Sequence, residues 1–470
     1  MASWEANVAE IVAAKQSAES AASHKLGVRE KVAYGLGNFG IQMIFIPGIE
    51  FVVYFYTDVV GIAPATVGTL IFVSQFLWLF NPVMGVMVDR THTRFGKARP
   101  WLLWMAAPFG ISAALLFRSP DLGPAGKVIY AFVTFTLAFT VCYTLVDVPY
   151  STLFSFMTTD RHERTSLSVI RMFFAYTGIL LTIGLTLPAV KFFGGGAQGW
   201  GRTFMIFGAI ATISLLACFA GTKERFQGQA ANAKTVVPLK ASVPALFRNK
   251  YLALLACVIF ATFVALGWRI ANLYYCRYLL HDAGLYGPLM VMMFAAQMFT
   301  LLFTPALARR FGKRNAALGG LLVTIAGQLL LYITPLTFTV LAIGTVIKGL
   351  GAGPIVGASF AMIADALEYG DWKWNLRNEG LAFGAMTLVM KTAEGFASAT
   401  VGWVLGWGGY IAGAAVQSAS ALRSINILML HLPLAFFVIS ALLLLAYNLD
   451  PRYPQIEAEL RERRLASSAG

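Results

Sequence analysis

Seven ionisable side chains stand inside long apolar stretches of this 470-residue sequence, where charge is unfavourable. An ionisable group in the hydrocarbon of a bilayer costs at least about 2.5–3.5 kcal/mol, so each one needs a partner or a function. An ion pair within the scaffold would explain any one of them. As a set, they could bind a polar substrate or carry a proton. They are Glu50, Asp147, Arg171, Arg269, Lys348, Lys391 and Glu394.

Two of these residues are equally distant from a predicted turn at Thr159. Asp147 comes twelve residues before it and Arg171 twelve residues after it. At a rise of about 1.5 Å per residue, a helical hairpin brings the two opposite charges to one depth, where each neutralises the other. Lys391 stands about twelve residues into a later apolar stretch and would join them. Glu394 follows Lys391 by three residues, so these two could pair on one helix face.

Three embedded acids could carry a proton, because burial favours the neutral form of a carboxyl group. Asp147 and Glu394 each have a cationic neighbour, which suits substrate binding or scaffold pairing better than proton release. Glu50 has no obvious partner in its own half of the chain, so it is the preferred proton carrier. The alternative is that Glu50 is structural and pairs with Arg269 or Lys348.

Four cations against three anions in this set indicate an anionic substrate, such as a uronide. If Glu50 pairs with Arg269 or Lys348, no charge is left for a substrate, and both interpretations stay open. Tyr150 and Trp268 could stack on a sugar ring or on a flat apolar substrate. Packing or an interfacial position is the simpler explanation for either ring.

The elements that hold these side chains must be membrane helices. The chain is 58% hydrophobic and 12% charged, with a mean hydropathy of +0.69, whereas soluble domains are about 25% charged. This composition excludes a cytosolic enzyme, a nucleic-acid-binding protein and a disordered scaffold. Because a span needs about 20 apolar residues, we predict an all-α membrane protein with twelve transmembrane helices. Their predicted ranges are 33–57, 66–88, 100–117, 127–156, 165–192, 203–221, 251–279, 286–308, 316–334, 337–366, 379–407 and 425–448.

The predicted orientation of the chain comes from its basic residues. Lys and Arg concentrate in the loops on one side of the twelve spans, the side that also holds both termini. The positive-inside rule therefore places both termini in the cytoplasm and the chain in the cell (inner) membrane. The opposite loops carry only Arg118, Lys127, Lys191, Arg202 and Arg423.

A polar interruption divides the chain into two halves. The motif RFGK at residues 94–97 recurs at residues 310–313, and each copy follows the second span of its half. This repetition indicates two parallel six-helix bundles, the architecture of the major facilitator superfamily. We predict a cytoplasmic lead at 1–32, bundles at 33–221 and 251–449, a cytoplasmic central loop at 222–250 and a cytoplasmic tail at 450–470.

Several motifs, spread in order over most of the chain, carry a resemblance to a known family. They are Tyr34–Gly40, Tyr56–Gly61, Asp89–Trp101, Asp147–Tyr150, Asp160–Arg164, Arg171–Ala175 and a stretch from Asp365 to Tyr410. Together they resemble the glycoside–pentoside–hexuronide:cation symporter family, typified by melibiose permease. The resemblance implies a major-facilitator transporter that moves sugars with Na⁺ or H⁺. It also implies a sugar-binding Asp147 and Arg171 and a site-organising Lys391.

The departures from the family pattern concern its cation site. The family places two carboxylates in the second span, one just before the proline that is Pro82 here and one a helical turn earlier, but the segment from Gln75 to Pro82 has none. Asn81 alone is a poor ligand for Na⁺. An acid that members place low on the first span, in the sugar site, is replaced by Gln42. We therefore expect no Na⁺ coupling, and H⁺ as the coupling ion if there is one.

Charged residues in the motifs on the termini side are predicted to serve gating, by bonds to helix ends across the bundle; tying of loops is the alternative. No metal site and no cofactor are predicted, because the histidines are scattered and no phosphate-cradling loop is present. The predicted gating residues are Asp89, Arg90, Arg94, Lys97, Asp365, Glu368, Arg377 and Glu379.

The leading hypothesis is a monomeric secondary active transporter, not an enzyme. It would move a sugar, glycoside or uronide by alternating access around a central cavity, with a small-molecule substrate and the lipid bilayer as its partners and no nucleic acid. One alternative is a carrier of an amphiphilic or aromatic organic anion or of a lipid. Another, from a different class, is a non-transporting membrane sensor on a transporter fold.

Overall fold

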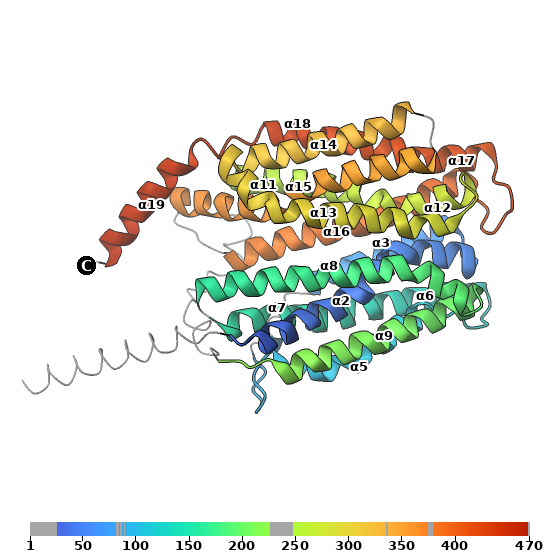
Figure 1. Cartoon of the computed structure of the whole chain (residues 1–470), viewed down its shortest axis with the longest axis horizontal. Coiled ribbons are helices and arrows are strands. Elements are labelled where there is room, and N and C mark those ends of the chain that lie inside the picture. Colours follow the sequence, from blue (N-terminus) through green and yellow to red (C-terminus); the bar gives the residue numbers. More distant parts are fainter. Residues whose placement is uncertain are drawn as a thin grey trace, which may run out of the picture.

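The computed structural model consists of helices that run side by side (Figure 1). It describes residues 26–80, 84, 87–88, 90–158, 160–225, 248–334, 337–374 and 379–468, and these contain no β-strand. The predicted linker at 222–250 and the predicted lead at 1–32 therefore fall largely outside the described residues.

The N-terminal half contains six helical rods among the described residues. Two of them are interrupted by π-helices, which insert an extra residue into a turn and mark functional sites in many proteins. The rods are α2 (Val28–Tyr54) with η1 (Phe55–Val59), α3 (Pro64–Gln75) with η2 (Phe76–Phe80), α5 (Arg99–Leu116), α6 (Pro124–Phe135) with η3 (Thr136–Cys142) and α7 (Tyr143–Met157), α8 (Arg161–Phe192), and α9 (Gly196–Gly221).

The C-terminal half repeats this pattern and adds a helix at the end. Its rods are α11 (Lys250–Gly267) with η4 (Trp268–Ile270) and α12 (Ala271–Tyr278), α13 (Tyr286–Phe311) preceded by η5 (Ala283–Leu285), α14 (Lys313–Ile333), α15 (Phe338–Trp374), α16 (Glu379–Trp407), and α17 (Ala419–Asn426) with η6 (Ile427–His431) and α18 (Leu432–Leu445). The added helix is α19 (Tyr453–Ser468).

Nine helices of the described part are long and apolar enough to cross a membrane. Helices α3, α5 and α16 lie at the predicted second, third and eleventh spans. The predicted spans are approximate, and some helices begin before them: α2 begins at Val28, ahead of the span predicted from about 33, and α8 begins at Arg161, ahead of the span predicted from about 165. The early start of α8 has a local cause, because the Asp160 side chain accepts a hydrogen bond of 2.8 Å from the Glu163 backbone N–H and caps the helix.

Glycines let helices cross closely inside each half. A Cβ added to Gly110 of α5 would lie 2.5 Å from the Gly208 carbonyl oxygen of α9, and one added to Gly351 of α15 would lie 2.4 Å from the Gly320 carbonyl oxygen of α14. In lipid there is no hydrophobic driving force for helix association. Close van der Waals packing at small residues stabilises the contact instead.

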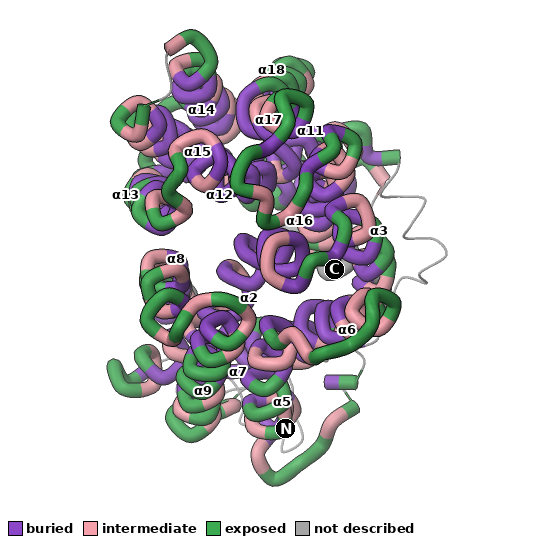
Figure 2. The backbone as a smooth tube through the Cα atoms, turned by 90° about the vertical axis from the view of Figure 1, so that its right-hand side faces the viewer, coloured by how far each residue is buried: buried purple, intermediate pink, exposed green. Residues whose placement is uncertain are grey.

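The two halves meet mainly through α3 against α16 and α8 against α13. Figure 2 looks along the helices from the end opposite the termini, and there α3 lies beside α16 while α8 faces α13. A Cβ on Gly68 of α3 would lie 2.5 Å from the Ala399 carbonyl oxygen of α16. Since Gly68 is in the first turns of α3, this contact lies toward the end opposite the termini.

Helix α19 packs onto the end of α15. Its Ile456 and Leu460 are buried, and Glu459 accepts a hydrogen bond of 2.6 Å from the Trp372 indole N–H. The alternating Glu and Arg at 457–464 by themselves predict a solvated helix. The alternation of apolar and charged residues at 456–464 gives α19 one apolar side, and that side is covered.

Candidate functional site

Three charged side chains from both halves form the centre of the candidate site. Asp147 on α7 interacts electrostatically with Arg171 on α8 and with Lys391 on α16. Asp147 lies ten residues before the end of α7, Arg171 ten residues after the start of α8, and Lys391 twelve residues after the start of α16. These spacings correspond to about 15–18 Å along a helix, half of a hydrocarbon core of about 30 Å. The structure therefore brings this predicted trio together near the middle of the membrane.

The π-helix η3 ends directly before Tyr143, the first residue of α7. Tyr143 and Asp147 are four residues apart and share a face of α7, and the Tyr143 hydroxyl donates a hydrogen bond to the Asp147 carboxylate. Arg171 is held from the other side, because its guanidinium donates a hydrogen bond of 3.4 Å to Ser151 and lies 5.1 Å from the Tyr150 ring centroid. The Arg171 Nε is buried without a partner among the described residues.

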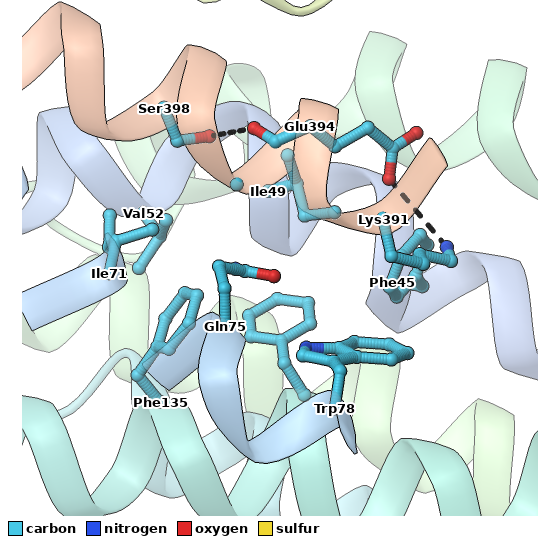
Figure 3. Close-up of a pocket in the computed structure, with 12 residues that line it drawn as sticks. Phe45, Ile49, Val52, Ile71, Gln75, Trp78, Phe135, Lys391, Glu394 and Ser398 are labelled. Atoms are coloured by element: carbon cyan, nitrogen blue, oxygen red, sulfur yellow. Dashed lines mark hydrogen bonds and ion pairs between the residues drawn. The ribbon is translucent and has the colours of Figure 1, made fainter. Parts of the chain in front are cut away.

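Aromatic rings surround the Lys391 ammonium. Its Nζ lies 3.6 Å from the Phe45 ring centroid, 5.2 Å from that of Tyr143 and 5.7 Å from that of Trp78. It also lies 3.6 Å from Glu394 Oε2, the ion pair drawn in Figure 3. Cation–π contacts of this kind contribute about 0.5–2 kcal/mol, so the rings help to hold the Lys391 side chain in this position.

A narrow pocket lies beside Lys391, between α2, α3, η2 and η3 of one half and α16 of the other. Gln75 and Trp78 extend into it from the N-terminal half and Glu394 borders it from the C-terminal half (Figure 3). It has room for about one or two water molecules. Phe45, Gln75 and Trp78 were not predicted to line the site. For Gln75 and Trp78, the absence of the family carboxylates from this part of the second span could have indicated it.

Glu50 is fully buried and bonded across the two halves. Its carboxylate forms an ion pair with Arg269 of η4 and accepts a hydrogen bond of 2.5 Å from the Tyr286 hydroxyl of α13. Arg269 also interacts electrostatically with Glu394, which connects this pair to the Lys391 side of the site. Of the two sequence interpretations for Glu50, the structure shows the pairing with Arg269. Tyr286 was not predicted, because an uncharged residue at a helix start gives no signal.

Lys348 is the one embedded cation that the network does not include. It lies on α15, 6% exposed, and makes no ion pair or hydrogen bond with any other residue that the structure describes. Glu50, Asp147 and Glu394 each have a cationic neighbour, so within the described part Lys348 is the charge left uncompensated.

Three further predicted substrate residues occupy different surroundings. Tyr150 stacks on Tyr34 with ring centroids 4.5 Å apart, and its hydroxyl donates a hydrogen bond of 2.9 Å to the Tyr34 carbonyl oxygen. Gln42 is half-buried, and its buried side-chain oxygen has no hydrogen-bond partner among the described residues. Trp268 is 2% exposed and packs edge-on against Phe436 of α18, 4.9 Å away. Trp268 thus packs inside the C-terminal half, whereas Tyr150 supports Arg171.

A second polar cluster joins the two halves at the end opposite the termini. The buried Asp58 of η1 accepts hydrogen bonds of 2.7 Å from Tyr278 and 2.8 Å from Tyr410, and lies 3.6 Å from Arg277. Thr57 and Tyr274 hydroxyls are 2.9 Å apart. The first-span motif around Asp58 was noted in the sequence, but no role was assigned to it. We call Thr57, Asp58, Tyr274, Arg277, Tyr278 and Tyr410 the outer cluster.

The predicted gating residues that are described form bonds within their own half. Glu224 caps α5 through hydrogen bonds of 2.8 Å from the backbone N–H of Lys97 and of Arg99, and Arg94 lies over the Phe95 ring. Lys313 pairs with Asp365 at 2.6 Å. Glu368 accepts a hydrogen bond from Tyr453, and Arg90 is exposed. Asp89, Arg377 and the side chain of Glu379 lie outside the described residues.

Comparison with known proteins decides the family. Residues 33–451 match the family described as MFS/sugar transport protein. The chain is 35% identical to the isoprimeverose transporter of Lactiplantibacillus pentosus over 448 residues, which cover 94% of this chain and 92% of the relative. The chain belongs to the glycoside–pentoside–hexuronide:cation symporter family. The resemblance inferred from the motifs is thus confirmed.

Other similar proteins agree with this membership. The symporter-family chain is 28% identical to the glucuronide carrier protein homolog of Escherichia coli, over 94% of this chain and 97% of the relative. A solved D-xylose-proton symporter superimposes with a TM-score of 0.62 at 16% identity, covering 89% of this chain and 96% of that one. The predicted fold, an all-α major-facilitator bundle of membrane helices, is confirmed, and the protein is a transporter and not an enzyme.

Proposed function

We propose that this protein is a proton-coupled symporter of a sugar, glycoside or uronide. The observation that carries the proposal is the meeting of Asp147, Arg171 and Lys391, from both halves, at about mid-membrane. A carboxylate beside two cations offers acceptors and charged donors to sugar hydroxyls, and charge-assisted hydrogen bonds are the strong ones. The isoprimeverose transporter and the glucuronide carrier homolog, by their names, handle ligands of this class.

Alternating access follows from where the halves touch. The outer cluster and the contact of α3 with α16 hold the halves together at the end opposite the termini. We propose that this conformation is closed to the outside and that the substrate site opens toward the side of the termini, the cytoplasm by the positive-inside rule. Opening to the outside requires the outer cluster and the Glu50–Arg269 pair to separate.

Proton coupling can use that separation. While Arg269 and Tyr286 contact Glu50, its carboxylate is charged and compensated. When the halves separate at the outer end, Glu50 loses both partners in apolar surroundings, where the neutral carboxyl is favoured, and takes up a proton from outside. Closure returns Arg269 to Glu50 and expels the proton toward the open inner side. Each cycle then moves a proton inward with the substrate.

We propose no comparable role for Na⁺. The family resemblance puts a cation-binding carboxylate about one turn before Pro82, where this chain has Trp78. The Trp78 ring faces the Lys391 ammonium instead, together with Phe45 and Tyr143. An ammonium among aromatic faces stands where oxygen ligands would be needed for a metal ion, and no group of three His, Cys, Asp or Glu in the described part could hold one.

The charges also favour an acidic substrate. Each of the three embedded acids has a cationic neighbour, but Lys348 has no anionic neighbour among the described residues. One positive charge therefore remains to be compensated. We propose that the acidic group of a uronide-like substrate supplies the compensating charge. The name of the glucuronide carrier homolog supports a ligand of this type.

Substrate counterflow in proteoliposomes tests the proposed function. Vesicles with purified protein and loaded with unlabelled ligand are offered the same labelled compound, with isoprimeverose and a phenyl glucuronide as the first probes. Exchange above that of protein-free vesicles is expected for at least one glycoside. In Lys348→Gln, the exchange rate of the glucuronide should fall more than that of isoprimeverose, whereas Lys348→Arg should retain exchange of both. Absence of exchange for every glycoside and uronide in a broad panel would contradict the proposal.

A further inference from the structure

A groove on the membrane-facing surface of the N-terminal half is separate from the substrate site. It lies between α5 and α9, the predicted third and sixth spans, and has a volume of about 970 Å³. That volume is at the upper end of the roughly 300–1,000 Å³ typical of ligand pockets. The two spans contain no embedded charge, so the apolar part of the groove faces lipid.

The groove runs over the crossing of the two helices and reaches toward the end opposite the termini. At the crossing, a Cβ on Gly208 would lie 2.3 Å from the Gly110 carbonyl oxygen, so the backbones touch there. Beyond the crossing, the small residues Ala114 and Gly201 line the groove. The side chains of Ile111 and Met205, 58% and 57% exposed, form apolar walls.

Two arginines stand at the end of the groove that lies opposite the termini. Arg118 follows α5 and Arg202 is in the second turn of α9, and both line the groove and are exposed. Neither forms an ion pair with any residue that the structure describes. Ser119 and Gln198 add polar groups at the same end. The groove is therefore apolar along its length and cationic at its mouth.

The placement of these arginines is unusual for this chain. Only five cations are predicted in the loops opposite the termini, and two of the five line this one groove. By comparison, Lys127 is bound to the protein itself, through a hydrogen bond of 3.1 Å to the Val60 carbonyl oxygen. On that side basic residues are disfavoured, so two unpaired guanidinium groups at one mouth call for an anionic partner.

We propose that this groove binds one anionic phospholipid, with its phosphate at Arg118 and Arg202 and an acyl chain along the gap between α5 and α9. Guanidinium groups bind phosphate oxygens in paired, charge-assisted hydrogen bonds, and basic pockets between membrane helices bind acidic head groups. A second copy of the chain is the less suitable occupant, because its same face would bring further unpaired arginines. With the orientation proposed above, the lipid belongs to the outer leaflet.

Native mass spectrometry of the delipidated protein tests the proposal. Phosphatidylglycerol and phosphatidylcholine are titrated onto wild type, the double variant Arg118→Gln/Arg202→Gln, and the control Arg423→Gln, which changes a cation of the same side outside the groove. We expect wild type and the control to bind one phosphatidylglycerol at least about tenfold more tightly than the double variant. Phosphatidylcholine should distinguish the three proteins much less.

A second variant fills the groove without changing its charge. Ala114→Trp keeps both arginines and should also weaken phosphatidylglycerol binding, with the thermal unfolding midpoint checked to confirm an intact fold. Equal phosphatidylglycerol affinity in wild type and the double variant would overturn the proposal. So would a dimer mass in wild type that the double variant lacks, because the groove would then belong to a second copy.

Discussion

At the scale of single residues, charge compensation explains most of the candidate site. Glu50 with Arg269 and Glu394 with Lys391 are ion pairs, while Asp147 lies between two cations. Breaking a buried pair by removing one partner leaves an uncompensated charge, which is more costly than the pair is favourable. Substitutions at these positions therefore need a control for the fold of the variant, and the carboxylates are best replaced by amides, which keep hydrogen bonding.

Asp147→Asn and Arg171→Ala are each expected to reduce substrate affinity by about tenfold to more than a hundredfold. One charged hydrogen bond contributes about 1.5–3 kcal/mol, and each side chain is proposed to contact substrate. Equilibrium binding of the labelled ligand to purified protein measures the loss. Thr177→Ala is the control on α8, because Thr177 is only half-buried and its hydroxyl donates a hydrogen bond to the Phe173 carbonyl oxygen of its own helix. Wild-type affinity in both variants would remove these residues from the site.

Glu50→Gln should spare substrate exchange and abolish accumulation driven by a pH gradient. The amide mimics the protonated carboxyl and can still accept the Tyr286 hydrogen bond, but it cannot release a proton. Counterflow and pH-driven uptake are measured in the same vesicles, with Glu394→Gln for comparison. If accumulation in Glu50→Gln proceeds at the wild-type level, the ion pair with Arg269 is structural only.

At the scale of elements, sequence periodicity and composition identified the spans, but not where they interact across the two halves. The depth of Asp147 and Arg171 could be predicted, because it depends only on helical rise and the position of a turn. The cross-half partners could not, because the pairing of Glu50 with Arg269 and Tyr286 depends on how the bundles dock. The outer cluster could not be predicted for the same reason, because Asp58 accepts hydrogen bonds from tyrosines more than 200 residues away in the sequence.

Asp58→Asn should weaken the closure of the outer end. In wild type, the Asp58 charge attracts Arg277 and strengthens the hydrogen bonds from Tyr278 and Tyr410. The variant loses this charge. A loss of about 1.5–3 kcal/mol would shift the conformational equilibrium by roughly tenfold or more toward the outward-open form. Spin labels at the exposed positions Lys191 and His281 report the opening as a longer-distance population.

The matched control for that measurement is Asp282→Asn. Asp282 lies in the neighbouring loop and caps its own turn, with a hydrogen bond of 2.8 Å from the Gly284 backbone N–H. It should leave the distance distribution as in wild type. An unchanged distribution in Asp58→Asn as well would show that the helix contact of α3 with α16 closes the outer end without the outer cluster.

At the scale of the whole molecule, we propose that the two halves rock around a site in which the Lys391 side chain takes the place of a bound metal ion. The halves are joined at the outer end, and the substrate trio Asp147, Arg171 and Lys391 spans both of them. Lys391 lies beside Trp78, at the position where the family resemblance places a cation-binding carboxylate. We propose that the energy for accumulation comes from protons, through a carboxylate whose partners depend on the conformation.

Initial rates of uptake of the labelled glycoside into proteoliposomes, under an imposed proton gradient or an imposed Na⁺ gradient, test this claim most directly. Wild type is expected to accumulate substrate with the proton gradient at a rate that Na⁺ leaves unchanged. At a substrate concentration below the wild-type KM, Asp147→Asn is expected to take up substrate at least about tenfold more slowly. Accumulation that requires the Na⁺ gradient and saturates with Na⁺ concentration, or uptake by Asp147→Asn at the wild-type rate, would contradict it.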